Sequence, residues 1–143
     1  MLEIGLGCDM NYGPLRSARL WRRYLPSHVE IWEAEYDAAC VAARQKDLDG
    51  LNIHALVGDQ ANISTLHMWL KSSSGNFDMI IDDGGHSNMQ MFNSFMVLFQ
   101  HGLRPGGIYV IEDVSVSRFA PYVDGDKQHI MIEVRTFLGR HKL

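Results

Sequence analysis

Short apolar runs alternate with helical patterns along almost the whole chain. Five runs are predicted to be strands, over residues 2–5, 29–34, 53–57, 77–81 and 108–111. Five stretches are predicted to be helices, over residues 17–24, 37–46, 63–70, 88–99 and 128–138. This alternation is typical of a parallel α/β sheet whose strands are joined by right-handed crossovers. The pattern therefore predicts a single α/β domain.

Two local patterns refine this prediction. In the fourth helical stretch, Phe92, Phe95, Met96 and Phe99 recur at the spacing of one helix face. The sequence LRPGG at 103–107 is rich in proline and glycine, so we expect a turn there before the fifth strand.

The composition is that of one ordinary globular domain. The chain has 143 residues, 46% of them hydrophobic and 21% charged, which argues against a disordered chain. A net charge of −4 and a pI near 5.9 provide no basic surface for a phosphate backbone, so we expect no nucleic acid partner.

The same features predict a soluble, cytoplasmic protein. No apolar run approaches the roughly 20 residues that cross a bilayer, so we expect no membrane association. Met1 leads directly into a strand, and a signal peptide is therefore not expected. Cys8 and Cys40 match neither a metal-binding spacing nor a disulfide framework, which suits a reducing compartment.

The fourth strand leads out of the core into a strongly polar sequence. In FDMIIDDGGH, at 77–86, a mostly apolar run is followed by two acids, two glycines and a histidine. Ligands of open α/β sheets bind outside the carboxyl ends of the strands. The position of these polar residues therefore marks them as candidates for a functional site.

The ends of the first three strands indicate a nucleoside site. Gly5 and Gly7 in LEIGLG would let a cofactor approach the backbone, although many strand–helix turns contain glycine without such a role. Glu35 closes the second strand, where an acid typically binds ribose hydroxyls. Asp59 follows the third strand. The coincidence of three such ends favours a bound cofactor.

The first loop also discriminates between nucleotide cofactors. The chain lacks a P-loop sequence and the third glycine of the dinucleotide fingerprint, which disfavours an NAD-linked enzyme. Glu3, Asp9 and Glu35 would repel phosphate groups. An adenosine cofactor without a pyrophosphate fits the sequence better.

The motif series resembles that of class I S-adenosylmethionine-dependent methyltransferases. The resemblance covers nearly the whole chain and lies in LEIGLG, EAEYD, GDQ, FDMIIDD, LRPGG and YVIED. DDGGH followed by a helix, and then LRPGGIYVIED, is similar to the metal-dependent sugar O-methyltransferases of macrolide biosynthesis. The resemblance implies a Rossmann-like, doubly wound parallel sheet of order 3-2-1-4-5.

The resemblance also implies the site and its cofactors. S-adenosyl-L-methionine would be bound by Glu3, Gly5, Gly7, Glu35, Gly58, Asp59, Gln60 and Asp82. Mg²⁺ or Mn²⁺ would be bound by Asp83, Glu112 and Asp113. His86 would be the catalytic base that deprotonates a hydroxyl of a small-molecule acceptor, such as a sugar or another natural product. Without the resemblance, His86 could equally be a polar residue at a helix start.

Elementary electrostatics supports a cation between these carboxylates. Neighbouring strands lie about 4.8 Å apart, so the ends of the fourth and fifth strands can converge on one ion. Clustered carboxylates raise one another's pKa unless a cation offsets their charge, and all-oxygen ligands favour Mg²⁺, Mn²⁺ or Ca²⁺. Consecutive strand residues face opposite sides, and Val114 and Ser115 offer no obvious turn. Glu112 is therefore the ligand with the weakest geometric support.

Two further expectations concern the length of the chain. Related methyltransferases have seven strands, and no strand-like run follows Ile111, so we expect the last two strands to be missing. The fifth strand would then be an exposed apolar edge, which predicts self-association into a homo-oligomer or aggregation. The rival hypothesis to an active enzyme is a cofactor-binding domain without methyl transfer.

Overall fold

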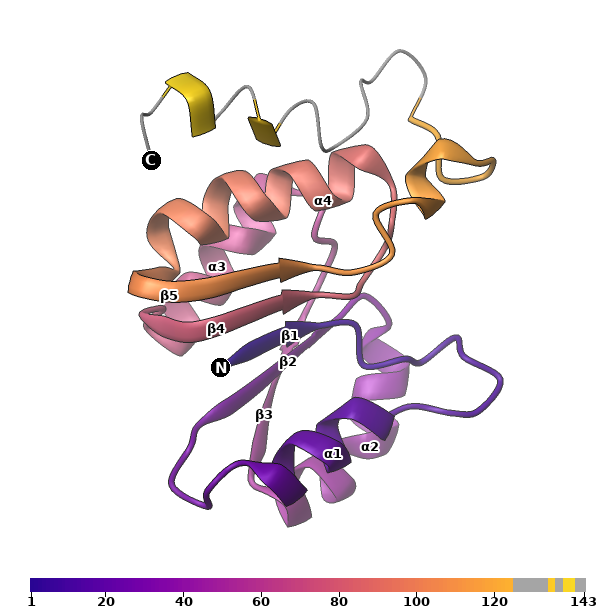
Figure 1. Ribbon diagram of the computed structural model, residues 1–143. Helices are drawn as coiled ribbons and strands as arrows, with labels where there is room; N and C mark the ends of the chain where they lie inside the picture. Colours follow the sequence, from indigo (N-terminus) through magenta and orange to yellow (C-terminus); the bar gives the residue numbers. More distant parts are fainter. Residues whose placement is uncertain (125–133, 136–137, 141–143) are drawn as a thin grey trace.

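Five parallel strands form one sheet in the order β3-β2-β1-β4-β5 (Figure 1). The structure, a computed structural model, describes residues 1–124, 134–135 and 138–140. The strands are β1 (Leu2–Ile4), β2 (Ile31–Glu35), β3 (Ile53–Val57), β4 (Phe77–Asp82) and β5 (Leu103–Ile111). The predicted Rossmann-like fold and its strand order are confirmed.

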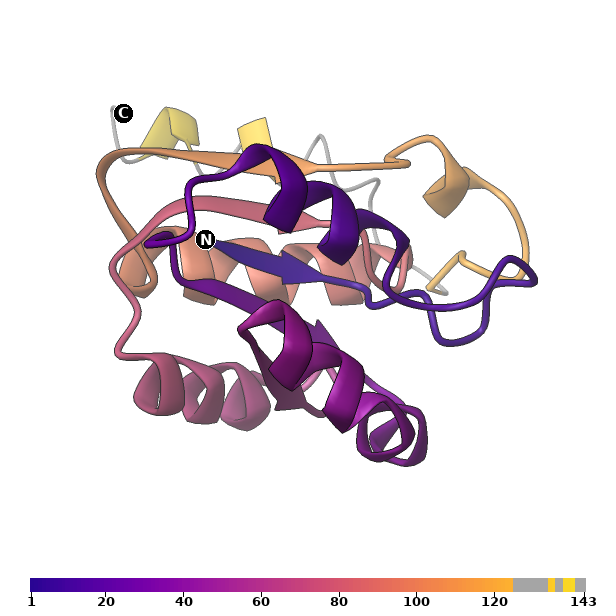
Figure 2. The same cartoon turned by 90° about the horizontal axis from the view of Figure 1, so that it is seen from below.

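Helices cover both faces of this sheet. They are α1 (Arg16–Tyr24), α2 (Ala38–Leu51), α3 (Ile63–Ser73), α4 (Asn88–Ser94), the π-helix η1 (Phe95–Phe99) and the 3₁₀-helix η2 (Val116–Arg118). Figures 1 and 2 show α1 and α2 on one face and α3 and α4 on the other. The helix predicted over 128–138 lies for the most part outside the described residues.

Each face of the sheet has its own hydrophobic core. Leu2, Ile4 and Ile80 pack with the apolar residues of α3 and η1, whereas Ile31 and Ile81 pack with those of α1 and α2. Alternate residues of a strand face opposite sides, so a parallel sheet covered on both faces is apolar on both. Two cores fix the register of the strands, and with it the position of every strand end.

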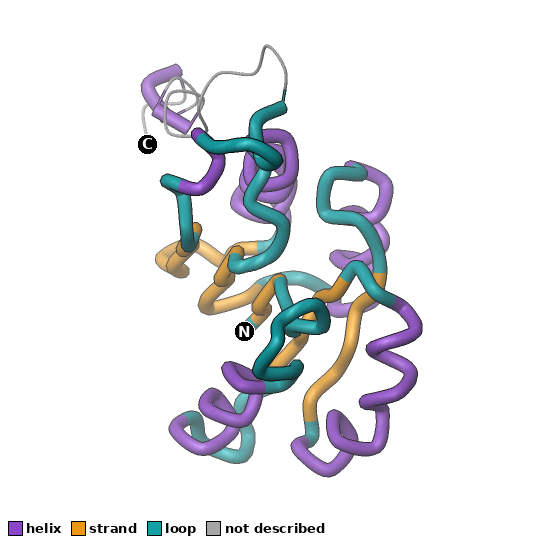
Figure 3. Tube along the Cα trace, turned by 90° about the vertical axis from the view of Figure 1, so that its right-hand side faces the viewer, coloured by secondary structure: helices purple, strands orange, loops and turns teal. Residues whose placement is uncertain are grey.

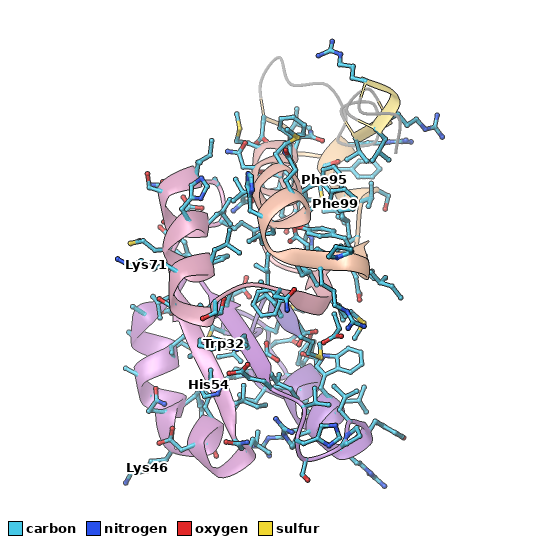
Figure 4. The ribbon with its side chains drawn as sticks, turned by 90° about the vertical axis from the view of Figure 1, so that its left-hand side faces the viewer. Trp32, Lys46, His54, Lys71, Phe95 and Phe99 are labelled. Carbon is cyan, nitrogen blue, oxygen red and sulfur yellow. A yellow bond between two sulfur atoms is a disulfide. The ribbon has the colours of Figure 1, made fainter. Side chains whose placement is uncertain are left out.

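The fourth helical stretch is helical throughout but buries a different stripe from the one predicted. It continues from α4 into η1, where Phe95 and Phe99 stack with ring centroids 4.9 Å apart (Figure 4). Met91, Phe95, Val97 and Leu98 are its buried apolar residues, whereas Phe92 is only half-buried. A π-turn shifts the following side chains around the helix axis, so a strict 3.6-residue period places the apolar face wrongly.

The expected turn at 103–107 is wrong, because β5 already begins at Leu103. Phe77 pairs with Leu103 and Met79 pairs with Ile108, so residues 104–107 form an irregularity within the strand. Gly106 has a φ of +81°, which glycine adopts easily. In the described part of the chain β5 pairs only with β4, and Ile108 is 60% exposed. Self-association through this edge stays a prediction, which light scattering can check.

The two cysteines form a disulfide, and the expectation that they match no disulfide framework is wrong. Cys8, in the loop after β1, is bonded to Cys40, in the first turn of α2. Their α-carbons lie 6.1 Å apart, although 32 positions separate them in the sequence. The ends of β1 and β2 are neighbours in the sheet, which brings these positions together. Two cysteines alone, without the fold, do not reveal this proximity.

Candidate cofactor and metal site

A cavity of about 910 Å³ opens where the strands end. Figure 3 looks on to this edge of the sheet, where the loops that follow the strands gather. The loops after β1, β2, β3 and β4 contribute to its lining, together with Asp113 and Tyr122. Its volume lies within the range of small-molecule sites, and its position at the carboxyl ends of the strands is the usual one for this sheet type.

One half of the cavity is lined by the predicted cofactor residues of β1, β2 and β3. Gly5, Gly7, Glu35, Gly58, Asp59 and Gln60 all line it. The Glu35 carboxylate accepts hydrogen bonds from the backbone N–H groups of Cys8, at 3.4 Å, and Asp37, at 3.0 Å. These bonds hold the acid at the end of β2 and tie the glycine loop to it.

The other half of the cavity carries a cluster of potential metal ligands. Asp83, His86 and Asp113 each offer one ligand atom, and these atoms all lie within 4.8 Å of one another. Asp83 and His86 belong to the loop between β4 and α4, while Asp113 follows β5. The structure therefore brings three of the predicted site residues together from two neighbouring strands.

Asp113 reaches this cluster because the backbone turns at Asp113 itself. Its φ is +48°, in the left-handed region that aspartate adopts more readily than most residues. The turn is closed by a hydrogen bond from the N–H of Val116 to the carbonyl oxygen of Asp113, at 2.9 Å. The sequence offered no glycine here, so this turn was not predicted.

Glu112 lies outside the three-residue cluster, but its charge acts on it. Burial raises the pKa of Asp83 to about 6, and the charge of Glu112 is the second cause of this shift. His86 acts in the opposite direction and Asp113 adds to the rise. Where neighbouring acids raise the pKa of a carboxyl group, a bound cation stabilises its ionised form, because the cation offsets the repulsion among the carboxylates. This donor set fits a hard divalent ion.

Glu3 and Asp82, both predicted to bind the cofactor, are absent from the described lining of the cavity. Glu3 is buried on the face covered by α1, where it accepts a hydrogen bond of 3.0 Å from the indole N–H of Trp21. Asp82 is 1% exposed, and burial raises its pKa to about 7 despite hydrogen bonds from Gln60, the backbone of Gly84 and Tyr109. Both acids are therefore buried in the sheet next to the cavity and do not line it.

Two features were missed from the sequence, one within the sheet and one in the cavity. Glu33 pairs with Glu3 in register and is buried, and burial together with the charge of Glu3 raises the pKa of Glu33 well above its usual value. Tyr122 lines the cavity beside His86, with ring centroids 6.1 Å apart. The acidic strand pattern LEI and WEAE signals the first feature. Nothing in the local sequence signals the second, since it depends on how residues 112–124 return over the loop after β4.

Known proteins share both this fold and this sequence pattern. No protein-family model matches the chain. L-olivosyl-oleandolide 3-O-methyltransferase of Streptomyces antibioticus is 36% identical over 131 residues, which cover 85% of this chain and 30% of that protein. Mycinamicin VI 2''-O-methyltransferase of Micromonospora griseorubida is 36% identical over 116 residues, which cover 80% of this chain and 27% of that protein.

A solved structure agrees with these relatives. The methyltransferase MycE of the mycinamycin biosynthetic pathway, in complex with Mg, SAH and mycinamycin VI, superposes with a TM-score of 0.75 and 30% identity. The match covers 96% of this chain and 34% of that one. The chain has the class I methyltransferase fold and is a relative of the sugar O-methyltransferases. It spans less than a third of the length of these two curated relatives.

Proposed function

We propose that this chain forms the cofactor- and metal-binding part of an S-adenosylmethionine-dependent O-methyltransferase that is assisted by a divalent metal. The observation that carries the proposal is one cavity with two chemically distinct halves. One half has Glu35 and the glycine loop, and the other has Asp83, His86 and Asp113. Such an arrangement would place a methyl donor beside a metal-bound hydroxyl acceptor.

S-adenosylmethionine is the cofactor that this cavity would hold, and it would supply an electrophilic methyl group. Glu35, at the end of β2, would accept hydrogen bonds from the ribose hydroxyls, as acids at this position do in related folds. Asp59 and Gly58 would form the neighbouring wall. Asp9 and Glu35, both in the described lining of the cavity, disfavour a pyrophosphate.

Mg²⁺ or Mn²⁺ is the metal that would be held by Asp83 and Asp113, with the charge of Glu112 close by. Its positive charge would lower the pKa of an acceptor hydroxyl. Burial and then the charges of neighbouring acids raise the pKa of Asp83, and a bound cation would offset the repulsion among these acids.

His86 would receive the hydroxyl proton on an imidazole nitrogen. A neutral imidazole can accept a proton near pH 7, and His86 lies on the cavity wall beside Asp83. We reserve His86 for this role and propose Asp83 and Asp113 as ligands. The loop between β4 and α4 then carries a ligand and the base within four residues.

The acceptor would be a hydroxyl group of a sugar or of another natural product. Support comes from the relative that is named for an olivosyl acceptor and from the structure that contains mycinamycin VI. The exposed ring of Tyr122 beside His86 would offer an apolar surface for such a molecule. Methyl transfer by the whole protein is likewise proposed.

A comparison of His86→Ala with the unaltered chain tests the division of roles. We expect the variant to bind Mn²⁺ as tightly as the unaltered chain and to lose about 10²- to 10⁴-fold in methyl transfer, the usual contribution of a general base. Methyl transfer from labelled cofactor to sugar acceptors measures the second quantity. Loss of Mn²⁺ binding would instead make His86 a ligand, and undiminished transfer would remove it from the mechanism.

The location of the protein is also proposed rather than observed. No helix in the described part of the chain is long and apolar enough to span a membrane. A cytoplasmic location stays part of the proposal, but the Cys8–Cys40 disulfide removes the cysteine argument for it.

A further inference from the structure

Gln60 connects the two halves of the cavity through a buried hydrogen-bond network. It follows β3, and its side chain is 5% exposed. Its amide nitrogen donates to Asp82 Oδ1 at 2.9 Å and to Ser94 Oγ at 3.1 Å. Its amide oxygen accepts the backbone N–H of Gly85 at 2.8 Å. All three of these bonds point away from β3, toward β4 and α4.

These contacts differ from those of a cofactor-binding residue. Gln60 lines the cavity, but both ends of its amide are already engaged by the protein. A β-carbon at Gly84 would lie 2.1 Å from the Gln60 amide oxygen, so the loop lies directly against this side chain. The loop can approach so closely only because it has glycine at this position.

The loop that Gln60 holds is the one that carries the metal and proton chemistry. Asp83 and His86 flank the Gly84–Gly85 pair on either side. Two glycines give a backbone many accessible conformations, so such a loop needs fixed contacts to hold its side chains in one place. The bond to the Gly85 N–H supplies one contact, and the bond to Asp82 anchors the same amide to the end of β4.

We infer that Gln60 is a positioning residue that holds the loop from Asp83 to His86 in the geometry required for metal binding and proton transfer. The inference rests on the function proposed above and adds to it a residue outside the metal ligands. Residues that orient ligands in this way typically contribute about 10- to 100-fold to metal affinity. Gln60 thereby connects the cavity lining after β3 to the loop after β4, which carries the proposed metal ligand and base.

The test compares Gln60→Met with Ser94→Ala. Methionine keeps the length of the side chain but removes both halves of the amide, while Ser94→Ala removes one partner of Gln60 and leaves its bond to Gly85 in place. Calorimetric titration with Mn²⁺ alone and with S-adenosylhomocysteine alone measures each half of the cavity separately. Thermal unfolding shows whether the variants are folded.

We expect Gln60→Met to weaken Mn²⁺ binding by about 10- to 100-fold, with little change in S-adenosylhomocysteine affinity. We expect Ser94→Ala to leave both affinities unchanged. If Gln60→Met does not fold, Gln60→Asn, which keeps the polar groups but is too short to reach both partners, should show the same selective loss. Mn²⁺ affinity that is unchanged in a folded variant would overturn the inference alone. No Mn²⁺ binding by the unaltered chain would overturn the proposed metal site as well.

Discussion

The carbonyl oxygen of Asp83 lies 2.2 Å from the point that a β-carbon on Gly5 would occupy. The N–H of Asp83 also donates to the carbonyl oxygen of Ile4, at 3.0 Å. Gly5 belongs to the loop that would hold the cofactor, and Asp83 belongs to the loop that would hold the metal. The two halves of the site therefore touch through their backbones, and the glycine is what permits this contact.

Gly5→Ala should disrupt both halves of the site at once. The residue has a φ of +110° and no room for a β-carbon, so the substitution adds strain and a clash of ~3 kcal/mol or more. We expect a lower unfolding midpoint and loss of both Mn²⁺ and S-adenosylhomocysteine binding. Gly50→Ala is the control, since Gly50 lies in α2 with open space around it. Normal binding of both ligands by Gly5→Ala would contradict the close contact.

Asp83→Asn should affect only the metal half. The cofactor contacts proposed here come from β1, β2 and β3, whereas Asp83 follows β4. We expect weaker Mg²⁺ binding and nearly unchanged S-adenosylhomocysteine binding, both measured by calorimetry. Asp78→Asn, at the opposite end of β4 and paired with Arg104, is a matched control that should change neither. Equal loss of both ligands in Asp83→Asn would show that the sites are not separate.

Much of this architecture could be predicted because it depends on patterns within single elements. The strand at 53–57 has the predicted bounds, and the acids and glycines at the strand ends indicated the edge where the cavity lies. The strands of a parallel sheet are buried on both faces and are therefore continuous apolar runs, which can be recognised in the sequence. The strand order came from the resemblance rather than from the pattern.

The features that were not predicted depend on contacts between elements. Gln60 occupies a position typical of cofactor binding, yet its amide faces Gly85 and Asp82, which belong to another loop and strand. The Cys8–Cys40 disulfide likewise needs the adjacency of β1 and β2. The left-handed turn at Asp113 is closed by the N–H of Val116, and no glycine in the sequence indicates it.

The buried acids should make the protein less stable as the pH rises. Burial raises the pKa of Asp82 to about 7, so between about pH 4 and pH 7 the folded state holds a proton that the unfolded state has released. The free energy of unfolding then falls through this window, by up to about 4 kcal/mol for Asp82 alone, at about 1.4 kcal/mol per pKa unit. Glu33, whose pKa is also raised, contributes with the same sign.

Asp82→Asn isolates this effect, because asparagine does not titrate. We expect the stability of the variant relative to the unaltered chain to rise between about pH 4 and pH 7 and to stay constant above that window. Urea unfolding at a series of pH values provides the free energies. Identical pH slopes for the two proteins would show that the Asp82 carboxyl group is not held protonated.

Reduction of the disulfide should destabilise the protein without unfolding it at low temperature. The bond joins residues 32 positions apart, and closing a loop of that length in the unfolded chain corresponds to about 3 to 4 kcal/mol. A reductant should therefore lower the unfolding midpoint, while a Cys8→Ser, Cys40→Ser double variant should not respond to it. Two free thiols in the denatured, unreduced protein would contradict the bond.

We expect one cavity at the strand ends to bind both S-adenosylmethionine and a divalent metal. Calorimetric titration of the chain with S-adenosylhomocysteine, with and without Mg²⁺, tests it most directly. We expect a saturable one-to-one isotherm for S-adenosylhomocysteine, and a separate Mg²⁺ isotherm with weaker binding in Asp83→Asn. If folded protein bound neither S-adenosylhomocysteine nor Mg²⁺, both halves of the proposed site would be contradicted.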